Sequence, residues 1–223
     1  MSTAILFDID GTLVDSTYHH ALAWHRAFVR HEVAVPMWRV HRAIGMGGDK
    51  LVAHVAGDGV ERDHGDDLRA AWEEEYAAVV AEVPPRPGAT ALVKGLVADG
   101  HTVALASSGA ERFSKKAVEL LGIGDDVAAM TNSDDAEDSK PDPDILSATL
   151  GQLGAVDGAV FLGDTPYDVE AAERLGLDCI AVLTGGFSRG ELEQAGAALV
   201  VEDLTELAGL DWSAHLRKPE RSA

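Results

Sequence analysis

Short apolar runs and helical patterns alternate along most of this chain. Apolar runs bounded by glycine or polar residues predict buried strands, and the amphipathic stretches between them predict covering helices. The expected strands are residues 4–7, 102–106, 127–130, 159–162, 179–183 and 199–201. The expected helices between them are residues 90–98, 110–121, 144–153, 169–175 and 191–195. This alternation predicts an α/β fold with a Rossmann-like parallel sheet core and helices on both faces.

One long interval, residues 16–83, departs from the alternation. It contains amphipathic helical patterns, at residues 18–31 and 66–82, but no convincing strand. The interval is several times longer than a parallel crossover needs, which predicts an inserted all-helical cap domain that closes as a lid. A proline-rich connector at residues 83–88 marks its end. The expected division is a Rossmann-like catalytic core of residues 1–15 and 86–223 and a helical cap of residues 16–85.

Composition and charge restrict the partners of the chain. Its 223 residues carry a net charge of −20, and the 18 lysines and arginines are scattered along the sequence. Such a field repels nucleic-acid phosphates and anionic membranes, so we expect no nucleic acid and no membrane partner. The single Cys179 excludes a disulfide framework, and neither a signal peptide nor a membrane-spanning run is evident. We therefore expect a cytoplasmic protein, a monomer or weak homodimer.

The first strand leads directly into the string Asp8-Ile9-Asp10-Gly11-Thr12. In open α/β sheets, ligands bind just beyond the carboxyl ends of the strands. Asp8 and Asp10 lie on the same side of an extended stretch, because side chains repeat with period two. Two carboxylates so close repel each other unless a cation is bound or a pKa is raised. The string therefore predicts a catalytic loop rather than an acidic turn.

Three further strand ends carry polar residues that suit a phosphate ester. Ser107 and Ser108 follow the second strand and offer hydroxyls and loop amides. Lys140 supplies a point charge that suits a phosphoryl oxygen. Asp164 and Asp168 follow the fourth strand and add two carboxylates. Each feature alone is commonplace, but their order, each after a strand, predicts one site.

Together these motifs resemble those of the haloacid dehalogenase-like hydrolase superfamily, in the subgroup with a helical cap inserted after the first motif. The resemblance runs from Ile5 to about Asp203. Its four motifs correspond here to Asp8-Ile9-Asp10-Gly11-Thr12, Ser107, Lys140-Pro141 and Gly163-Asp164-Thr165-Pro166-Tyr167-Asp168. These motifs specify the superfamily strongly and the substrate weakly.

The resemblance implies a hydrolase that transfers a phosphoryl group through an aspartyl-phosphate. Asp8 would be the nucleophile, and Asp10 would donate a proton to the leaving oxygen and later accept one from water. Ser107, Ser108 and Lys140 would hold the phosphoryl oxygens.

A Mg²⁺ cofactor is implied with this chemistry. The resemblance assigns it to the Asp8 carboxylate, the Asp10 backbone carbonyl and the Asp164 carboxylate, with Asp168 as a further ligand or a partner of the ligands. We therefore expect a Mg²⁺-dependent phosphatase acting on a small phosphorylated metabolite, either phosphoglycolate-like or a sugar phosphate.

Other activities on the same fold remain open. Asp10 argues against dehalogenation, because displacing halide needs no acid. A β-phosphoglucomutase-like sugar-phosphate mutase is the first alternative: His19, His20 and Trp24 are similar to its cap hinge, but residues 44–51 lack its Gly-x-Ser-Arg pattern. A phosphonoacetaldehyde hydrolase would need Lys50 as a Schiff-base lysine. A non-catalytic phosphometabolite-binding relative is disfavoured because every catalytic position is occupied.

The cap contributes candidates for substrate selection. The glycine-rich stretch 45–51 is interpreted either as a specificity loop or as a flexible turn between helices. The expected specificity residues are Met46, Gly48, Asp49, Lys50 and His20. We expect Trp38 and Trp72 to lie in the cap core, and Asp15 with Ser16 to cap the first cap helix.

Overall fold

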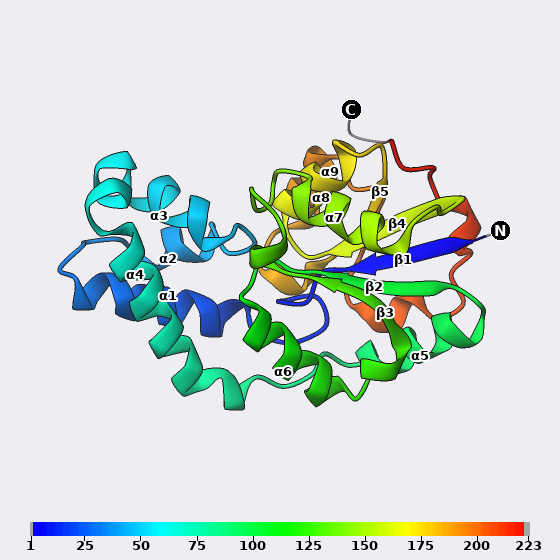
Figure 1. Ribbon diagram of the computed structural model, residues 1–223, viewed down its shortest axis with the longest axis horizontal. Helices are drawn as coiled ribbons and strands as arrows, with labels where there is room; N and C mark the ends of the chain where they lie inside the picture. The colour runs from blue at the N-terminus through cyan, green and yellow to red at the C-terminus, as the bar shows by residue number, and fades with distance from the viewer. Residues whose placement is uncertain (1, 221–223) are drawn as a thin grey trace.

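The computed structural model describes residues 2–220 and contains a six-stranded parallel sheet (Figure 1). The strands are β1 (Thr3–Phe7), β2 (Thr102–Ala106), β3 (Val127–Thr131), β4 (Gly158–Gly163), β5 (Asp178–Val182) and β6 (Leu199–Val201). They lie in the order β3-β2-β1-β4-β5-β6, so β1 is hydrogen-bonded to both β2 and β4. The predicted parallel sheet is confirmed, with strand ends within one residue of those expected.

Helices cover both faces of the sheet. They are α5 (Ala89–Ala98), α6 (Glu111–Leu121), α7 (Asp144–Leu153), α8 (Pro166–Glu173) and α9 (Arg189–Ala195). Alternate residues of β1 point to opposite faces: Ile5 and Phe7 join the apolar cluster under α5 and α6, and Leu6 joins the cluster under α7, α8 and α9. Burial on both faces explains why the strands are continuous apolar runs.

A second group of helices is inserted between β1 and α5. These are α1 (Thr17–Arg30), α2 (Met37–His41), α3 (Gly48–Ala56) and α4 (Asp58–Val79). They form a lobe beside the sheet, with a separate apolar cluster that includes Trp24, Phe28, Leu51 and Leu68. Short 3₁₀ segments complete the described structure: η1 (Val80–Glu82), η2 (Gly124–Asp126), η3 (Ser133–Asp135), η4 (Leu183–Gly185), η5 (Leu204–Leu207) and η6 (Trp212–Ala214).

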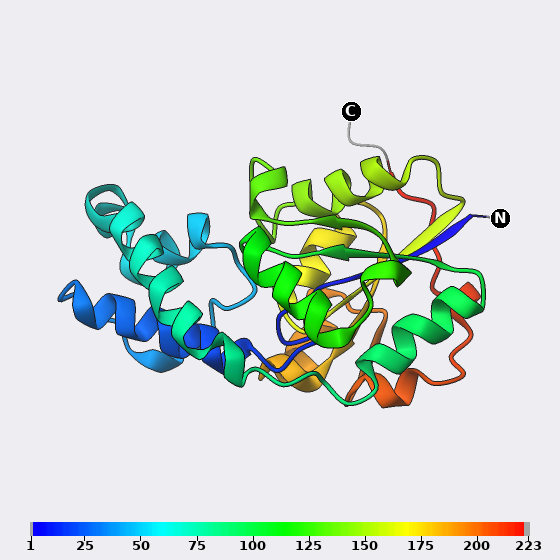
Figure 2. The same cartoon turned by 60° about the horizontal axis from the view of Figure 1, so that its bottom comes forward.

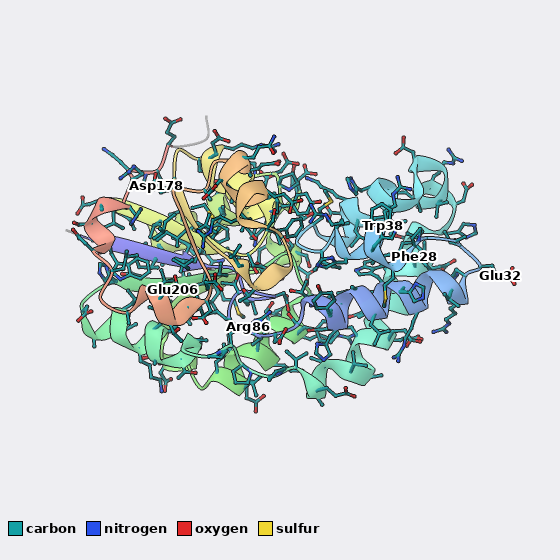
Figure 3. The ribbon with its side chains drawn as sticks, turned by 180° about the vertical axis from the view of Figure 1, so that it is seen from behind. Phe28, Glu32, Trp38, Arg86, Asp178 and Glu206 are labelled. Carbon is teal, nitrogen blue, oxygen red and sulfur yellow. The ribbon has the colours of Figure 1, made fainter. Side chains whose placement is uncertain are left out.

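The lobe lies at the carboxyl ends of the strands, as Figures 1 and 2 both show. Its two connections to the sheet are bonded to each other. The Asp15 amide donates to the Pro84 carbonyl (2.9 Å), and the Arg86 amide donates to the Leu13 carbonyl (2.9 Å). An ion pair of 3.0 Å joins Arg86 to Asp15. Arg86 lies between the lobe and the sheet (Figure 3). The two connections therefore form one hinge.

The expected cap of α1 by Asp15 and Ser16 is wrong. Ser16 occupies the N-cap position, but its side chain makes no capping hydrogen bond. Its hydroxyl instead donates to Asp10 Oδ1 (2.6 Å), and Asp15 pairs with Arg86. Both side chains find charged partners, and hydrogen bonds to charged groups are stronger than bonds to backbone amides.

Trp38 is also not where the sequence placed it. It is 69% exposed and lies on the lobe surface, in the region labelled in Figure 3. Helix α2 is only five residues long and buries Val40 alone, so its other side chains remain outside. Trp72, in contrast, packs against Trp24 with ring centroids 5.3 Å apart.

Among residues 2–220, no helix has both the length and the apolar character that a membrane-crossing segment requires.

Candidate active site

The predicted site residues meet at the carboxyl edge of the sheet. Asp8 follows β1, Ser107 follows β2 and Asp164 follows β4. The sheet pattern continues into these positions, because the Asp8 amide donates to the Leu162 carbonyl (2.8 Å) and the Ser107 amide donates to the Thr131 carbonyl (3.1 Å). The backbone that presents Asp8 and Ser107 is therefore fixed by neighbouring strands. This is the edge where open α/β sheets bind ligands.

Lys140 lies at the centre of this site with only 1% of its surface exposed. Its Nζ donates to Asp8 Oδ1 and lies 2.9 Å from Asp168 Oδ1. Burial by itself would lower the pKa of Lys140, but the ion pairs with Asp168 and Asp8 raise it above its ordinary value. The ammonium group therefore stays protonated, and it neutralises part of the surrounding negative charge.

The carboxylates around Lys140 are crowded. Burial raises the pKa of Asp8 to about 7 against the opposing effect of Lys140, and the charges of Asp168 and Asp10 add to the rise. Burial also raises the pKa of Asp164 well above its ordinary value, with further increases from Asp168 and Asp8. The single positive charge of Lys140 therefore cannot neutralise all of these carboxylates.

The same aspartates fit a divalent cation. Asp8, Asp164 and Asp168 each offer a carboxylate oxygen, and these oxygens lie within 4.8 Å of one another. Asp164 Oδ2 is buried and finds no hydrogen-bond partner within residues 2–220. Two glycines leave room around it, since a Cβ atom at Gly11 or Gly185 would lie only 2.1 or 2.2 Å from this oxygen. Hard carboxylate oxygens are the ligands that Mg²⁺ prefers.

Asp168 also organises the loop after β4. Its Oδ2 accepts hydrogen bonds from the amides of Asp164 (3.2 Å) and Thr165 (3.0 Å) and from the Thr165 hydroxyl (2.7 Å). The Thr165 side chain accepts from the Asp168 amide in return, which forms a capping box at the start of α8. One carboxylate thus holds both this turn and Lys140.

The partners of the Asp10 side chain are His20 in α1 and Ser16, the residue before that helix. Its Oδ1 accepts from Ser16 Oγ (2.6 Å) and lies 2.9 Å from His20 Nε2. Burial would raise the pKa of Asp10, but His20 and Ser16 together outweigh it and lower this pKa. His20 is held in turn by stacking on Tyr76, with ring centroids 3.8 Å apart. The contact of Ser16 with Asp10 was missed, although Ser16 directly precedes the lobe.

The serines after β2 leave hydroxyl groups free for a ligand. Ser107 Oγ accepts from the Gly109 amide (3.0 Å), which leaves its hydroxyl proton available. Ser108 Oγ is buried and has no hydrogen-bond partner among the described residues. Both serines therefore have unused donor capacity beside Asp8 and Asp10.

A cavity of about 50 Å³ lies between these residues and the lobe. It is lined by Asp8, Asp10, His20, Trp24, Ile44, Gly45, Met46, Gly48, Trp72, Ser108 and Gly109. Three of the expected specificity residues, His20, Met46 and Gly48, are among them. Trp72 packs against the lobe cluster, as expected, and its ring, stacked on Trp24, also forms part of this wall.

Asp49 and Lys50, expected beside the leaving group, are not part of the cavity wall. Lys50 Nζ donates to the Ser139 carbonyl (2.8 Å) and forms an ion pair with Asp142. Asp49 Oδ2 accepts from the Ser139 amide (3.2 Å), and the Gly47 amide donates to Ser139 Oγ (3.0 Å). The start of α3 thus holds the residue that precedes Lys140, and it connects the lobe to the catalytic lysine.

Comparison with known proteins agrees with this arrangement. The family model for haloacid dehalogenase-like hydrolases matches residues 5–182. A phosphoglycolate phosphatase from Rhodospirillum rubrum is 32% identical over 224 residues, which cover 95% of this chain and 91% of that protein.

Solved structures of similar proteins share this fold. A hydrolase from Pseudomonas syringae aligns with a TM-score of 0.87 and 30% identity, covering 93% of this chain and 96% of that one. CbbY from Rhodobacter sphaeroides, solved in complex with phosphate, aligns with a TM-score of 0.76 and 27% identity, covering 94% of this chain and 98% of that one.

Proposed function

The chain belongs to the haloacid dehalogenase-like hydrolases and is a phosphoric monoester hydrolase, and from this premise we propose that it is a Mg²⁺-dependent phosphatase acting through an aspartyl-phosphate on Asp8. The observation that carries the proposal is the buried contact of Asp8 with Lys140, beside Asp164 and Asp168 at the strand ends. The substrate is a small phosphorylated metabolite, with phosphoglycolate-like esters and sugar phosphates as the two candidates.

Asp8 and Asp10 carry the two chemical steps. An Asp8 carboxylate oxygen attacks phosphorus, and the bond from phosphorus to the leaving oxygen breaks as Asp10 donates a proton to that oxygen. Water then attacks the phosphorus of the acyl phosphate while Asp10 takes the proton from water, which releases phosphate and restores Asp8.

The remaining residues position and neutralise the transferring group. Lys140 and the Ser107 and Ser108 hydroxyls hold phosphoryl oxygens, and phosphoryl transfer depends mainly on such positioning and charge neutralisation. Asp8, Asp164 and the Asp10 backbone carbonyl would hold Mg²⁺. When bound there, it would neutralise charge on the transferring phosphoryl group.

Two observations disfavour the alternative activities. A sugar-phosphate mutase must bind a second phosphate, yet within residues 2–220 no lysine or arginine lines the lobe side of the cavity. A phosphonoacetaldehyde hydrolase needs a lysine amine at its substrate, and Lys50 is engaged with Ser139 and Asp142 instead. The phosphatase is the activity that both observations favour.

A panel of phosphomonoesters tests the proposal directly. Wild-type protein is expected to release inorganic phosphate from at least one small ester with Mg²⁺ and to lose this activity when the metal is chelated. Conversion of β-glucose 1-phosphate to glucose 6-phosphate without net release would favour the mutase instead. Absence of any turnover would overturn the enzymatic assignment of the site.

Thermal unfolding provides a test of the metal site that does not depend on activity. Without metal, Asp164→Asn is expected to melt about 2–6 °C above wild type, because the amide removes one of several crowded buried carboxylates. Added Mg²⁺ is expected to raise the melting temperature of wild type and to have little effect on the variant. The control is Asp125→Asn, at an exposed position, which should match wild type with and without metal. An equal Mg²⁺ shift in Asp164→Asn would contradict the site.

Several broader expectations stay predictions from the sequence. The cytoplasmic location, the monomeric or weakly dimeric state and the lack of nucleic-acid or membrane partners belong to this group. We also propose the division into a core of residues 1–15 and 86–223 and a cap of residues 16–85. It is supported by the separate apolar cluster of the lobe and by the hinge at Asp15 and Arg86.

A further inference from the structure

The active-site cavity has two chemically different halves. Its sheet side carries the carboxylates and the serine hydroxyl described above. Its lobe side consists of aromatic and aliphatic side chains and glycine backbone, namely Trp24, Ile44, Gly45, Met46, Gly48 and Trp72. Because the phosphoryl group must lie beside Asp8, the lobe side is the half that receives the leaving group.

Among the described residues, two cations near the lobe side, Lys50 and Arg69, are engaged elsewhere. Lys50 is held by Ser139 and Asp142, as described above. Arg69 Nη1 donates to the Gly48 carbonyl (3.0 Å) and pairs with Glu61 (2.9 Å). Its Nη2 pairs with Asp66 (2.8 Å). Neither side chain belongs to the cavity wall, and both already have carboxylate partners.

Two further basic groups, Lys140 and His20, adjoin the rest of this cavity and are paired with carboxylates. Lys140 contacts Asp8 and Asp168 on the sheet side. His20 lines the cavity, but its Nε2 lies 2.9 Å from Asp10. A carboxylate on the leaving group would therefore enter an apolar half-cavity whose wall, within residues 2–220, has no free lysine or arginine, close to the Asp10 carboxylate. Burying an unpaired anion beside like charges is strongly unfavourable.

An uncharged leaving group meets a favourable surface in the same place. Trp24 and Trp72 are stacked, with ring centroids 5.3 Å apart, and Met46 adds a polarizable thioether. Such walls gain free energy by covering C–H surface. The peptide groups of Gly45 and Gly48 lie at the wall without side chains, so a ligand can approach them closely.

We propose that the lobe half of the cavity selects phosphate monoesters of small uncharged alcohols, such as polyols or sugars, and rejects esters whose alcohol part carries a carboxylate. The inference rests on the proposed phosphatase function and chooses between its two candidate substrates. On this proposal, phosphoglycolate, which appears in the name of the Rhodospirillum rubrum relative, is a poor substrate for this chain.

Matched pairs of esters test the proposal in the wild-type protein with Mg²⁺. Suitable pairs are glycerol 3-phosphate with 3-phosphoglycerate, and 2-phosphoglycolamide with 2-phosphoglycolate, which differ mainly in the carboxylate. The neutral member of each pair is expected to have the higher kcat/KM, by a factor on the order of 10². Higher kcat/KM for the carboxylate members would overturn the proposal and leave the phosphatase function intact. If no ester is hydrolysed, the phosphatase function itself fails.

A charge introduced on the lobe side gives an independent test. Met46→Lys adds a cation of similar length to the wall, and it is expected to lower the neutral-to-anionic ratio of kcat/KM at least about tenfold. Met46→Gln is the matched control, because it is polar and uncharged, and it should keep the ratio near the wild-type value. Equal ratios in the lysine and glutamine variants would show that wall charge does not decide selectivity and would overturn the proposal. Far-ultraviolet circular dichroism verifies that both variants fold.

Discussion

Asp8→Asn is expected to lower phosphate release at least about 10⁴-fold, because an amide oxygen is a poor nucleophile and forms no stable bond to phosphorus. The change is nearly isosteric, so the substrate still finds Ser107 and Lys140 in place. The measurement is steady-state phosphate release at saturating Mg²⁺, with the best ester from the panel. A single-turnover experiment with wild type, quenched in acid, should trap phosphate on the protein, and the variant should trap none.

The control for this prediction lies in the same loop. Asp15→Asn removes a carboxylate that pairs with Arg86 at the hinge and does not line the cavity. This variant is expected to form the same acid-stable phosphoprotein as wild type. Phosphate release by Asp8→Asn within about tenfold of wild type would rule out covalent catalysis by Asp8.

Lys140→Met is expected to remove both activity and stability. The methionine fills a similar volume, but Asp8 and Asp168 lose a cation that is almost fully buried with them. Removing one partner from a buried ion pair costs about 3–5 kcal/mol of unfolding free energy, which corresponds to a drop of roughly 6–20 °C in the melting temperature. Phosphate release should fall at least about 10³-fold, because the transferring oxygens lose a charged partner.

A second substitution separates these two effects. In the double variant Lys140→Met, Asp168→Asn, one of the unpaired carboxylates is neutralised, so much of the lost stability should return. Activity should not return, since no cation is restored for the phosphoryl group. Thermal unfolding and phosphate release are measured for Lys140→Met, Asp168→Asn and the double variant, which together with wild type form a double-mutant cycle. If the double variant melts no higher than Lys140→Met, the charge of Asp168 is not what Lys140 compensates.

The sequence predicted correctly those features that depend on residues close together along the chain. Each strand is a short apolar run because both faces of a covered parallel sheet are buried, so its position was readable within one residue. The same logic located the candidate active site, since the polar residues that follow β1, β2 and β4 must share one edge. The long helical interval after β1 was similarly visible as an interruption of the strand pattern.

Contacts that depend on the path of the chain in space were not readable in this way. Ser16 looked like a helix cap, but its hydroxyl bonds to Asp10, six residues earlier in the chain. Lys50 looked available for a ligand until the fold placed it on Ser139, 89 residues away. Trp38 looked like a core residue but is exposed, whereas Trp72 packs against the lobe cluster as expected and also lines the cavity.

The sequence by itself thus determined the parallel sheet, the inserted helices and the group of aspartates, serines and lysine at the strand ends. These features follow from burial and from side-chain alternation along single segments. Only the tertiary structure decided which charges remain free. Lys50, Arg69 and Lys140 all carry the same charge in the sequence, but each is neutralised by carboxylates that folding brings to it. The physical reason is that electrostatic interactions depend on distances in space, and residues far apart along the chain set those distances.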